Sequence, residues 1–568
     1  MNNKPWWRAA LAATAFLTFA SAAVTAPAIV LSSPEDEIAM LGKGGDDGEA
    51  FEESSGPGAV TGGIPTQGAW FPEVGDPVKA VSFDKDLRSI PQTTPEELAK
   101  LRSTRGMRPE MTLPADRLAS PNLNVADAVA QTANALAMPA AGANFAGLDL
   151  TNWGAGWPPD THGDVGPNHY IQTVNTSIGI YDKATGARLA AFTLDNFFGG
   201  TGTPCDTANQ GDPYTLYDVY SGRWIVTDFS WPGSVSAGPY YQCFAISKTA
   251  DPVAGGWWFY GLQVSTRDLN DYPKLGIWHD GIYMTANMFR RASSFSGSKI
   301  WALNRADMIS GAPLRSISFS LGSSYASLLP AHVRSTLPPA SRPEFFLARG
   351  GTSTTLRMWK MTTNWTTPSA STLTGPTNIT VASYTVPSGK VPQSGSTVTL
   401  DTLSDRLMSA VAYSNVGGNE ALWVNHTVSS GGTMGVRWYE IRNPAATPTV
   451  FQQGTFQPDS TYRWMGSVGV DKQGNMAVGY SASSSSLFPQ IRYAGRLAGD
   501  PAGALSQGEA TLIAGTGSQT SYSRWGDYAS MQVDPVDGCT FWFTTEYYAT
   551  TGTNWQTRVG SFKYPGCN

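Results

Sequence analysis

The sequence predicts an all-β fold for residues 144–568, most simply a seven-bladed β-propeller, and three observations support this prediction. After Phe145, short apolar segments such as His169–Tyr181 alternate with turns rich in Gly, Pro, Asn, Asp and Ser. Only 14% of the residues are charged, whereas 11% are aromatic and 60 are Gly, a composition typical of turn-rich β proteins. A polar motif also recurs along the chain.

The recurring motif places an Asp or an Arg at the start of successive strand segments, at nearly equal intervals. Its members are Asp164, Asp212, Asp271, Arg406, Arg463 and Arg524. The long interval after Asp271 requires one further unit, which we place near residues 343–361. The count is therefore seven. It becomes six if that unit is misread, and eight if residues 300–400 contain another.

The N-terminus predicts export. Lys4 and Arg8 precede the apolar run Ala9–Ala23, and small residues follow it, as in a secretory signal peptide, which we assign to residues 1–26. No later stretch is long and apolar enough for a membrane helix. We therefore expect a secreted, extracellular protein with no membrane span in its mature form.

Residues 27–143 are expected to form a separate, weakly structured region. Residues 35–53 are acidic and Gly-rich, which is typical of disorder. Thr94–Glu97 has the pattern of a helix start with a capping box, and a second short helix is expected over Val125–Ala137. A pro-segment, a spacer and an arm packed on the propeller all fit this region.

The four cysteines allow three pairings, and the simplest, between neighbours, predicts the disulfides Cys205–Cys243 and Cys539–Cys567. Disulfides suit an oxidising compartment, and no two cysteines have the close spacing of a zinc site. The net charge of −6 argues against nucleic acid as a partner. We expect a monomer.

Three motifs suggest relatives. Pro158–Asn175, Asn270–Trp278 and Arg524–Pro535 resemble motifs of secreted bacterial β-propeller proteins of sialidase-like texture, which have no established activity. The resemblance covers roughly residues 150–567 and implies the fold and an extracellular location. In particular, Arg406, Arg463 and Arg524 are similar to the carboxylate-binding arginine triad of sialidases. For the sialidase Tyr–Glu nucleophile pair the sequence offers Glu546–Tyr547.

The candidate ligand site is the mouth where the repeated polar positions gather. Arginine forks bind carboxylate, sulfate or phosphate groups, and aromatic rings stack on sugar faces. The expected ligand-binding residues are Arg406, Arg463, Arg524, Trp464, Trp525 and Tyr528. The alternative for each repeated residue is a structural Arg–Asp pair between neighbouring blades.

Five residues are candidates for acid–base catalysis: Asp212, Asp271, Asp527, His162 and His279. Asp160 and Asp164 are the candidates for a calcium site, with Asx turns as the alternative explanation. No metalloprotease motif, nucleophile elbow, P-loop or dinucleotide fingerprint is present.

Two functions remain. The first is a non-catalytic module that binds a polysaccharide or surface glycan at the mouth, and the sequence slightly favours it because no acid–base pair identifies itself. The second is a glycoside hydrolase or polysaccharide lyase acting at the same mouth. The fold cannot decide between them, because propellers host both.

Overall fold

A computed structural model describes residues 70–568 except 92–93, 106–110, 115, 133–135 and 208. The signal peptide and the acidic stretch expected at residues 1–26 and 35–53 lie outside these residues. The described chain is all-β, as predicted, with a few short helices. In this part of the chain, no helix is both long and apolar enough to span a membrane.

Most of the described strands form seven four-stranded antiparallel units, two of which join in one nine-stranded sheet. The first three units follow the chain order. They comprise β6 (His162–Val165), β7 (His169–Val174), β8 (Ser177–Asp182) and β9 (Arg188–Thr193); β10 (Tyr214–Asp218), β11 (Arg223–Ser230), β12 (Tyr240–Ser247) and β13 (Trp257–Ser265); and β14 (Asp268–Ile277), β15 (Ile282–Arg290), β16 (Ser294–Leu303) and β17 (Ser316–Leu321).

The next three units continue the pattern. They comprise β18 (Leu329–Val333), β19 (Glu344–Arg349), β20 (Thr355–Thr362) and β21 (Thr372–Thr380); β23 (Met408–Val416), β24 (Asn419–Ser430), β25 (Thr433–Arg442) and β26 (Thr449–Phe456); and β27 (Tyr462–Val470), β28 (Met476–Ser484), β29 (Leu487–Arg496) and β30 (Glu509–Ile513). The unit expected near residues 343–361 is therefore β18–β21.

The last unit joins the two ends of the β domain. β31 (Ser530–Val533), β32 (Phe541–Tyr547) and β33 (Gln556–Phe562) are completed by β5 (Asn144–Asp149), which pairs antiparallel with β33. β33 thus pairs with an upstream strand and not with the first unit, and β5 satisfies the backbone groups at the edge of β33.

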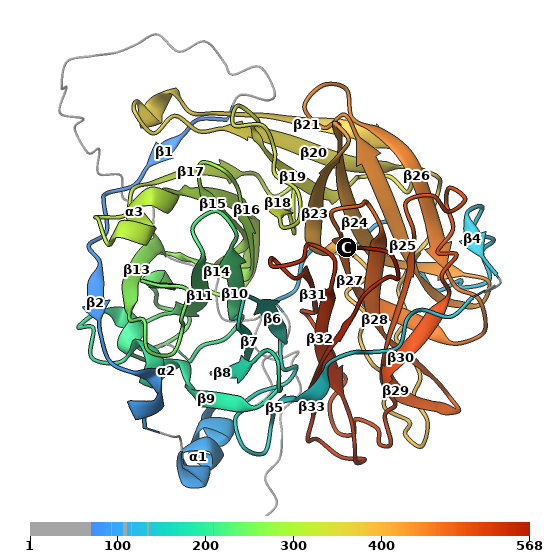
Figure 1. The fold of residues 1–568 in the computed structure, drawn as a ribbon, viewed down its shortest axis with the longest axis horizontal. Helices are drawn as coiled ribbons and strands as arrows, with labels where there is room; N and C mark the ends of the chain where they lie inside the picture. Colours follow the sequence, from blue (N-terminus) through green and yellow to red (C-terminus); the bar gives the residue numbers. More distant parts are fainter. Residues whose placement is uncertain (1–69, 92–93, 106–110, 115, 133–135, 208) are drawn as a thin grey trace, which may run out of the picture. The chain divides into compact units, whose positions relative to one another are not determined.

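The first strand of each unit contacts the first strand of the next. This holds for β6, β10, β14, β18, β23, β27 and β31 in turn, and β31 contacts β6 again. β18 and β23 pair in parallel, so their starts lie at the same end. Figure 1 shows these seven strands toward the middle and β9, β13, β17, β21 and β26 toward the outside. We call the seven strands the inner strands.

The described parts of residues 70–131 lie along these sheets as an arm (Figure 1). Its strands β1 (Glu73–Val74), β2 (Val81–Phe83) and β4 (Ala130–Gln131) extend the units that end in β17, β13 and β26. β3 (Ala119–Ser120) pairs with β22 (Val386–Pro387). Adding strands to open edges satisfies their backbone groups, so the arm protects three of the outer edges.

The arm contains one of the two expected helices. α1 (Pro95–Arg105) begins with the predicted capping box, in which the Glu97 carboxylate accepts from the Thr94 amide at 2.8 Å. The helix expected over Val125–Ala137 is wrong, since the described residues there include β4 and no helix. Asp127 forms a buried ion pair with Arg437 at 2.7 Å, and this tertiary contact outweighs local helix propensity.

The remaining helices are short and lie between strands. They are η1 (Leu87–Ser89), α2 (Leu194–Phe198), η2 (Pro204–Thr207), α3 (Arg305–Ser310) and η3 (Pro368–Ala370).

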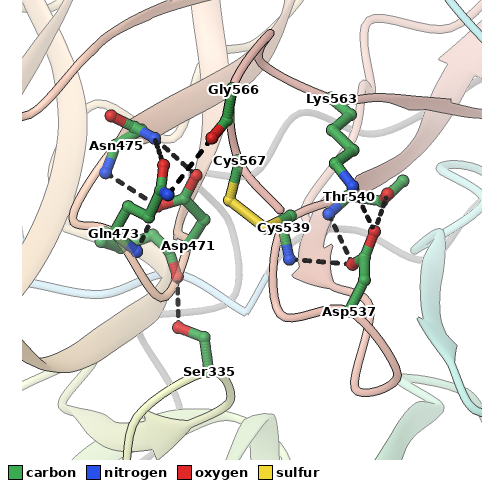
Figure 2. Close-up of a disulfide and its surroundings, with 11 residues drawn as sticks. Ser335, Asp471, Gln473, Asn475, Asp537, Cys539, Thr540, Lys563, Gly566 and Cys567 are labelled. Carbon is green, nitrogen blue, oxygen red and sulfur yellow. Dashed lines mark hydrogen bonds and ion pairs between the residues drawn. A yellow bond between two sulfur atoms is a disulfide. The ribbon is translucent and has the colours of Figure 1, made fainter.

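Both predicted disulfides are confirmed, Cys205–Cys243 and Cys539–Cys567. Figure 2 shows the second bond beside the Asp471 turn. The Asp471 carboxylate accepts from the amides of Gln473 and Asn475, each at 2.9 Å, so this turn is held by hydrogen bonds. The disulfide connects Cys567, the penultimate residue, to the loop before β32.

Candidate functional site

The starts of the inner strands carry an unusual backbone conformation. Asp160, Asp212, Tyr272 and Asp527 have φ angles of 51°, 53°, 57° and 58°, in the left-handed region that costs non-glycine residues energy. Ser327 and Met465 share this conformation in two further units. Four of these residues precede an inner strand by two or three positions, namely Asp160, Asp212, Ser327 and Asp527. Tyr272 and Met465 lie instead at register shifts within β14 and β27.

Three units meet at the Asp212 carboxylate. One of its oxygens accepts from the Tyr272 amide and from the Tyr528 hydroxyl, both at 3.0 Å. Asn175 links Asp212 to Asp160, because its side chain accepts from the Asp212 amide at 3.1 Å and donates to Asp160 at 2.6 Å. The structure therefore brings together Asp160, Asp212 and Tyr528. Asp271 precedes Tyr272 in β14 and is half-buried.

Lys274 lies at the centre of this group. Its Nζ is 3.2 Å from the ring centroid of Tyr272 and 3.1 Å from that of Tyr528. The side chain is 1% exposed, and the amine has no hydrogen-bond partner among the described residues. The face of an aromatic ring attracts a cation. The Lys274 amine is therefore contacted by two tyrosine rings where a buried amine normally has a hydrogen-bond acceptor. We call Lys274, Tyr272, Tyr528, Asp212, Asp160 and Asp527 the start cluster.

Burial shifts the titration of the start cluster. The pKa of Asp160 is raised well above its ordinary value, first by burial and then by the nearby Asp212 and Asp527 carboxylates. Burial lowers the pKa of Lys274 well below its ordinary value, although Asp212 and Asp160 oppose this. Both groups are thus pushed toward their neutral forms, as in sites where an acid or a base is held for proton transfer.

Two of the three predicted arginines lie beside the start cluster, but both are held by carboxylates. Arg524 donates to Asp401 at 3.0 Å and to Asp527 at 2.5 Å. Arg406 binds both oxygens of Asp405, at 2.7 and 3.0 Å. Although burial alone would raise it, the pKa of Asp405 is lowered because Arg406 stabilises the carboxylate. The aspartates that hold these arginines were not foreseen.

Arg463 belongs to a different group, so its assignment to the mouth is wrong. All five of its N–H groups are used, on Asp459, Glu509 and the carbonyl of Thr461. The side chain is fully buried. It holds β27 to β30 and has no donor left for a ligand.

The three predicted aromatic platforms are also buried. Trp464 and Trp525 are 0% exposed and pack against each other with ring centroids 5.9 Å apart. Tyr528 is 1% exposed and covers Lys274. None presents a face to a sugar, so the sequence prediction of stacking at these residues is wrong. They form core between units.

The two histidine candidates lie apart. His162 begins β6, is buried, and stacks on Tyr214 with ring centroids 3.6 Å apart. His279 follows the far end of β14, and its Nε2 lies 2.8 Å from the carbonyl oxygen of Arg342. Because Asp271 is near the beginning of the same strand, His279 cannot act together with it.

Asp160 and Asp164 do not form the expected calcium site. The Asp164 carboxylate is bound to the guanidinium of Arg334 at 3.0 Å, a cation that already occupies it, whereas Asp160 binds Asn175. Within the described residues, no three His, Cys, Asp or Glu side chains are grouped to hold a metal ion.

Glu546 and Tyr547 do not form a nucleophile pair either. They are neighbours in β32, so their side chains point to opposite faces of the sheet. Glu546 is fully buried and accepts from the Gly526 amide at 2.6 Å. Burial raises the pKa of its carboxyl well above the ordinary value.

The opposite end of the inner strands is closed by Arg334. Its five N–H groups bind Asp164 and the carbonyls of Val165, Tyr217 and Val533, which belong to three other units. The next residue, Ser335, donates to the carbonyl of Val470 at 2.8 Å. We call Arg334, Ser335 and Asp164 the finish lock. Neither the lock nor Lys274 was predicted, although Lys274 lies inside the motif Asn270–Trp278.

A groove lies next to the start cluster. Its volume is about 330 Å³, at the lower end of the range for ligand sites. The arm and the segment before β23 form its walls, which are lined by Thr112, Leu113, Pro114, Asp116, Ala119, Val386, Pro387, Ser388, Gly389, Lys390, Asp401, Thr402, Leu403, Ser404 and Asp405. Asp401 and Asp405, the partners of Arg524 and Arg406, thus face both the arginines and the groove.

Comparison with known proteins identifies no family. No protein-family model and no curated protein matches the chain. Among solved structures, an α-L-arabinanase from Penicillium chrysogenum is 11% identical with a TM-score of 0.32, over 60% of this chain and 94% of its own. A protein of unknown function from Dyadobacter fermentans is 9% identical with a TM-score of 0.34, over 62% and 94%.

A Trypanosoma rangeli sialidase is 8% identical with a TM-score of 0.30, over 59% of this chain and 54% of its own. These similarities are too low to support a function. The function is therefore argued from the residues of the site.

Proposed function

We propose that this chain is a secreted seven-bladed β-propeller that binds a polysaccharide or surface glycan in the groove beside the start cluster. The cyclic contacts of the seven inner strands support the blade count. The signal-like N-terminus and the two disulfides support secretion. The proposal includes a monomer without a nucleic-acid partner, in keeping with the net charge of −6.

The groove is the observation that carries this proposal. It is large enough for a few sugar units, and eight of its described lining residues have polar side chains, from Thr112 to Asp405. Asp401 and Asp405 are held in place by Arg524 and Arg406. Fixed acceptors lose little conformational entropy when a ligand binds, which suits recognition of hydroxyl groups.

The start cluster supports a second candidate function, a carbohydrate-active enzyme. Asp160 and Lys274 are buried groups pushed toward their neutral forms, beside the carboxylate of Asp212. Such a set could donate and accept protons. Binding is favoured because Asp160 is 4% and Lys274 1% exposed, so a substrate would not reach them in this conformation.

A blocked groove tests the binding proposal. Gly389 lines the groove, and a Cβ atom added there has only Met434 within 4 Å, at 3.9 Å, so we expect the bulky ring of Gly389→Trp to obstruct the groove. Gly499→Trp is the matched control, because Gly499 has open space around it and lies outside the groove. We expect glycan binding by affinity electrophoresis to fall at least tenfold in Gly389→Trp and to stay unchanged in the control.

A panel of neutral and acidic polysaccharides, assayed for binding and for product release, separates the two functions. New reducing ends or unsaturated-uronate absorbance that disappear in Asp160→Asn would establish the enzyme. Binding without product release would leave the binding proposal standing. Equal affinity of the two tryptophan variants would refute the groove as the site.

A further inference from the structure

We infer that Arg267 and Arg291 form a second site, which binds the sulfate or carboxylate groups of an anionic polysaccharide. The inference goes beyond the proposed function, because neither residue lines the groove. The three arginines that we expected to bind acidic groups are each held by carboxylates of the protein. Arg267 and Arg291, which we call the arginine pair, belong to none of the sequence motifs.

The backbone places the arginine pair side by side at the end where β14 begins. Asp268 and Arg290 are the outermost register partners of β14 and β15. One step further out, the Arg291 amide donates to the Arg267 carbonyl at 2.8 Å. Residues that lie opposite each other in an antiparallel ladder have Cβ atoms about 5 Å apart, so the two side chains leave the backbone close together.

The arginine pair carries two positive charges that the protein does not neutralise. Both side chains are exposed, and within the described part of the chain neither guanidinium donates a hydrogen bond or forms an ion pair. The neighbouring carboxylate of Asp268 is bound instead to Nε of Arg290 at 2.5 Å. Like charges at opposite positions destabilise a sheet, and an anion bound between them removes that cost.

The turn between β15 and β16 gives an independent reason to assign a role to Arg291. The Ser293 amide donates to the Arg290 carbonyl at 3.0 Å, which closes a β-turn. The central residues of this turn, Arg291 and Ala292, have φ angles of 52° and 53°. Glycine and asparagine adopt this conformation at lower cost, so turn formation does not explain an arginine there. A binding role does.

The chemistry of the arginine pair indicates the class of ligand. A guanidinium offers a planar fork of donors that matches two oxygens of a sulfate or a carboxylate. The Ser265 hydroxyl accepts from the amides of Arg267 and Asp268, at 3.1 and 2.9 Å, so the backbone beneath the pair is held in place. A glycan is favoured over nucleic acid, because the net charge of −6 repels a densely charged polymer.

Matched neutral and acidic polymers test the arginine pair on the whole secreted chain. Dextran sulfate and polygalacturonate supply the two acidic groups, and dextran is the neutral reference. We expect affinity electrophoresis to show binding of at least one acidic polymer that weakens with added salt, and no comparable binding of dextran. The double variant Arg267→Gln with Arg291→Gln should lower this affinity about fivefold, a modest factor because exposed ion pairs are weak.

Two controls separate the arginine pair from overall charge and from the groove. Lys79→Gln with Lys85→Gln removes the same charge from exposed positions of the arm and should leave the affinity for the acidic polymer unchanged. Gly389→Trp, which obstructs the groove, should also leave it unchanged. An equal loss of affinity in the lysine and arginine variants would overturn the inference, as would acidic binding that disappears in Gly389→Trp.

The remaining outcomes keep this inference apart from the proposed function. If neither acidic polymer binds, or if dextran binds as tightly as dextran sulfate, the arginine pair is not an anion site, while binding of other neutral glycans in the groove still stands or falls by its own test. If a DNA duplex binds more tightly than both acidic polymers and the arginine variant loses it, the pair recognises nucleic acid and the inference is wrong. Binding of only one acidic polymer supports the inference and identifies sulfate or carboxylate as the group recognised.

Discussion

The two ends of the inner strands bury a basic side chain among the units in opposite ways. Arg334 of the finish lock uses all five N–H groups on oxygens from other units. Lys274 of the start cluster lies between two tyrosine rings without a hydrogen-bond acceptor among the described residues. A saturated cation holds units together, whereas an unsaturated one costs stability. We therefore interpret the finish lock as a structural contact and the start cluster as the end where a functional group is more plausible on physical grounds.

The largest expected effect is at the finish lock. Arg334→Met leaves the buried Asp164 without its cation and frees carbonyls of three units. We expect the free energy of unfolding to fall by about 3–5 kcal/mol, measured by denaturant unfolding. Arg267→Met is the control, since Arg267 is exposed. A loss below about 1 kcal/mol would show that the lock does not hold the units.

The second-largest effect is expected at His332, close to the finish lock, when the pH is lowered. Burial lowers the pKa of His332 from 6.5 to about 3. Between those values the unfolded chain binds a proton that the folded chain does not, so the stability from this group is lost as the pH falls. Relative to wild type, His332→Gln should gain about 2 kcal/mol on going from pH 7 to pH 4.5.

Wild type must be compared with His332→Gln at each pH, because the titration of Asp164 changes the stability of the fold in the opposite direction. Its pKa is raised by burial to about 6, so its proton favours the folded state as the pH falls below 6. Wild type and His332→Gln share this contribution, and it cancels. His169→Gln is the control, because His169 is only half-buried. Parallel pH profiles for wild type and His332→Gln would contradict the prediction.

At the start cluster, a mutation is expected to raise the free energy of unfolding and not to lower it. Lys274→Met replaces a buried amine without a hydrogen bond by an apolar side chain of similar length. We expect stability at pH 7 to rise by about 1 kcal/mol, because the desolvation cost disappears. A loss of several kcal/mol would mean that the rings of Tyr272 and Tyr528 hold Lys274 as a stabilising cation.

The smallest effect is expected at Asp160. Asp160→Asn keeps an acceptor for Asn175 and removes a carboxyl whose pKa is raised by burial. The wild-type group destabilises the fold as the pH rises above the ordinary aspartate range, so the variant should gain about 0.5 kcal/mol at pH 8 and nothing at pH 3. Calorimetry at both pH values tests this. A stability loss at pH 8 would indicate an ionised, well-solvated Asp160.

Local patterns in the sequence predicted the features that depend on neighbours in the chain. The alternation of strands and turns gave the all-β class, and the spacing of the cysteines gave both disulfides. The capping box of α1 followed from four residues, Thr94 to Glu97. The helix expected over Val125–Ala137 failed because a partner far along the chain, Arg437, fixes Asp127.

By itself, the sequence determined the strand texture, the disulfide pairs and the polar residues that begin successive units. Only the tertiary structure decided which of them meet: Asp212 with Tyr528, Arg524 with Asp401, and Arg334 with Val165 and Val533. The physical reason is that a pairing between strands of different units depends on how the sheets pack. Arginines in similar motifs can therefore have different surroundings. Arg406 lies beside the start cluster, whereas Arg463 is buried in the core with all of its N–H groups used.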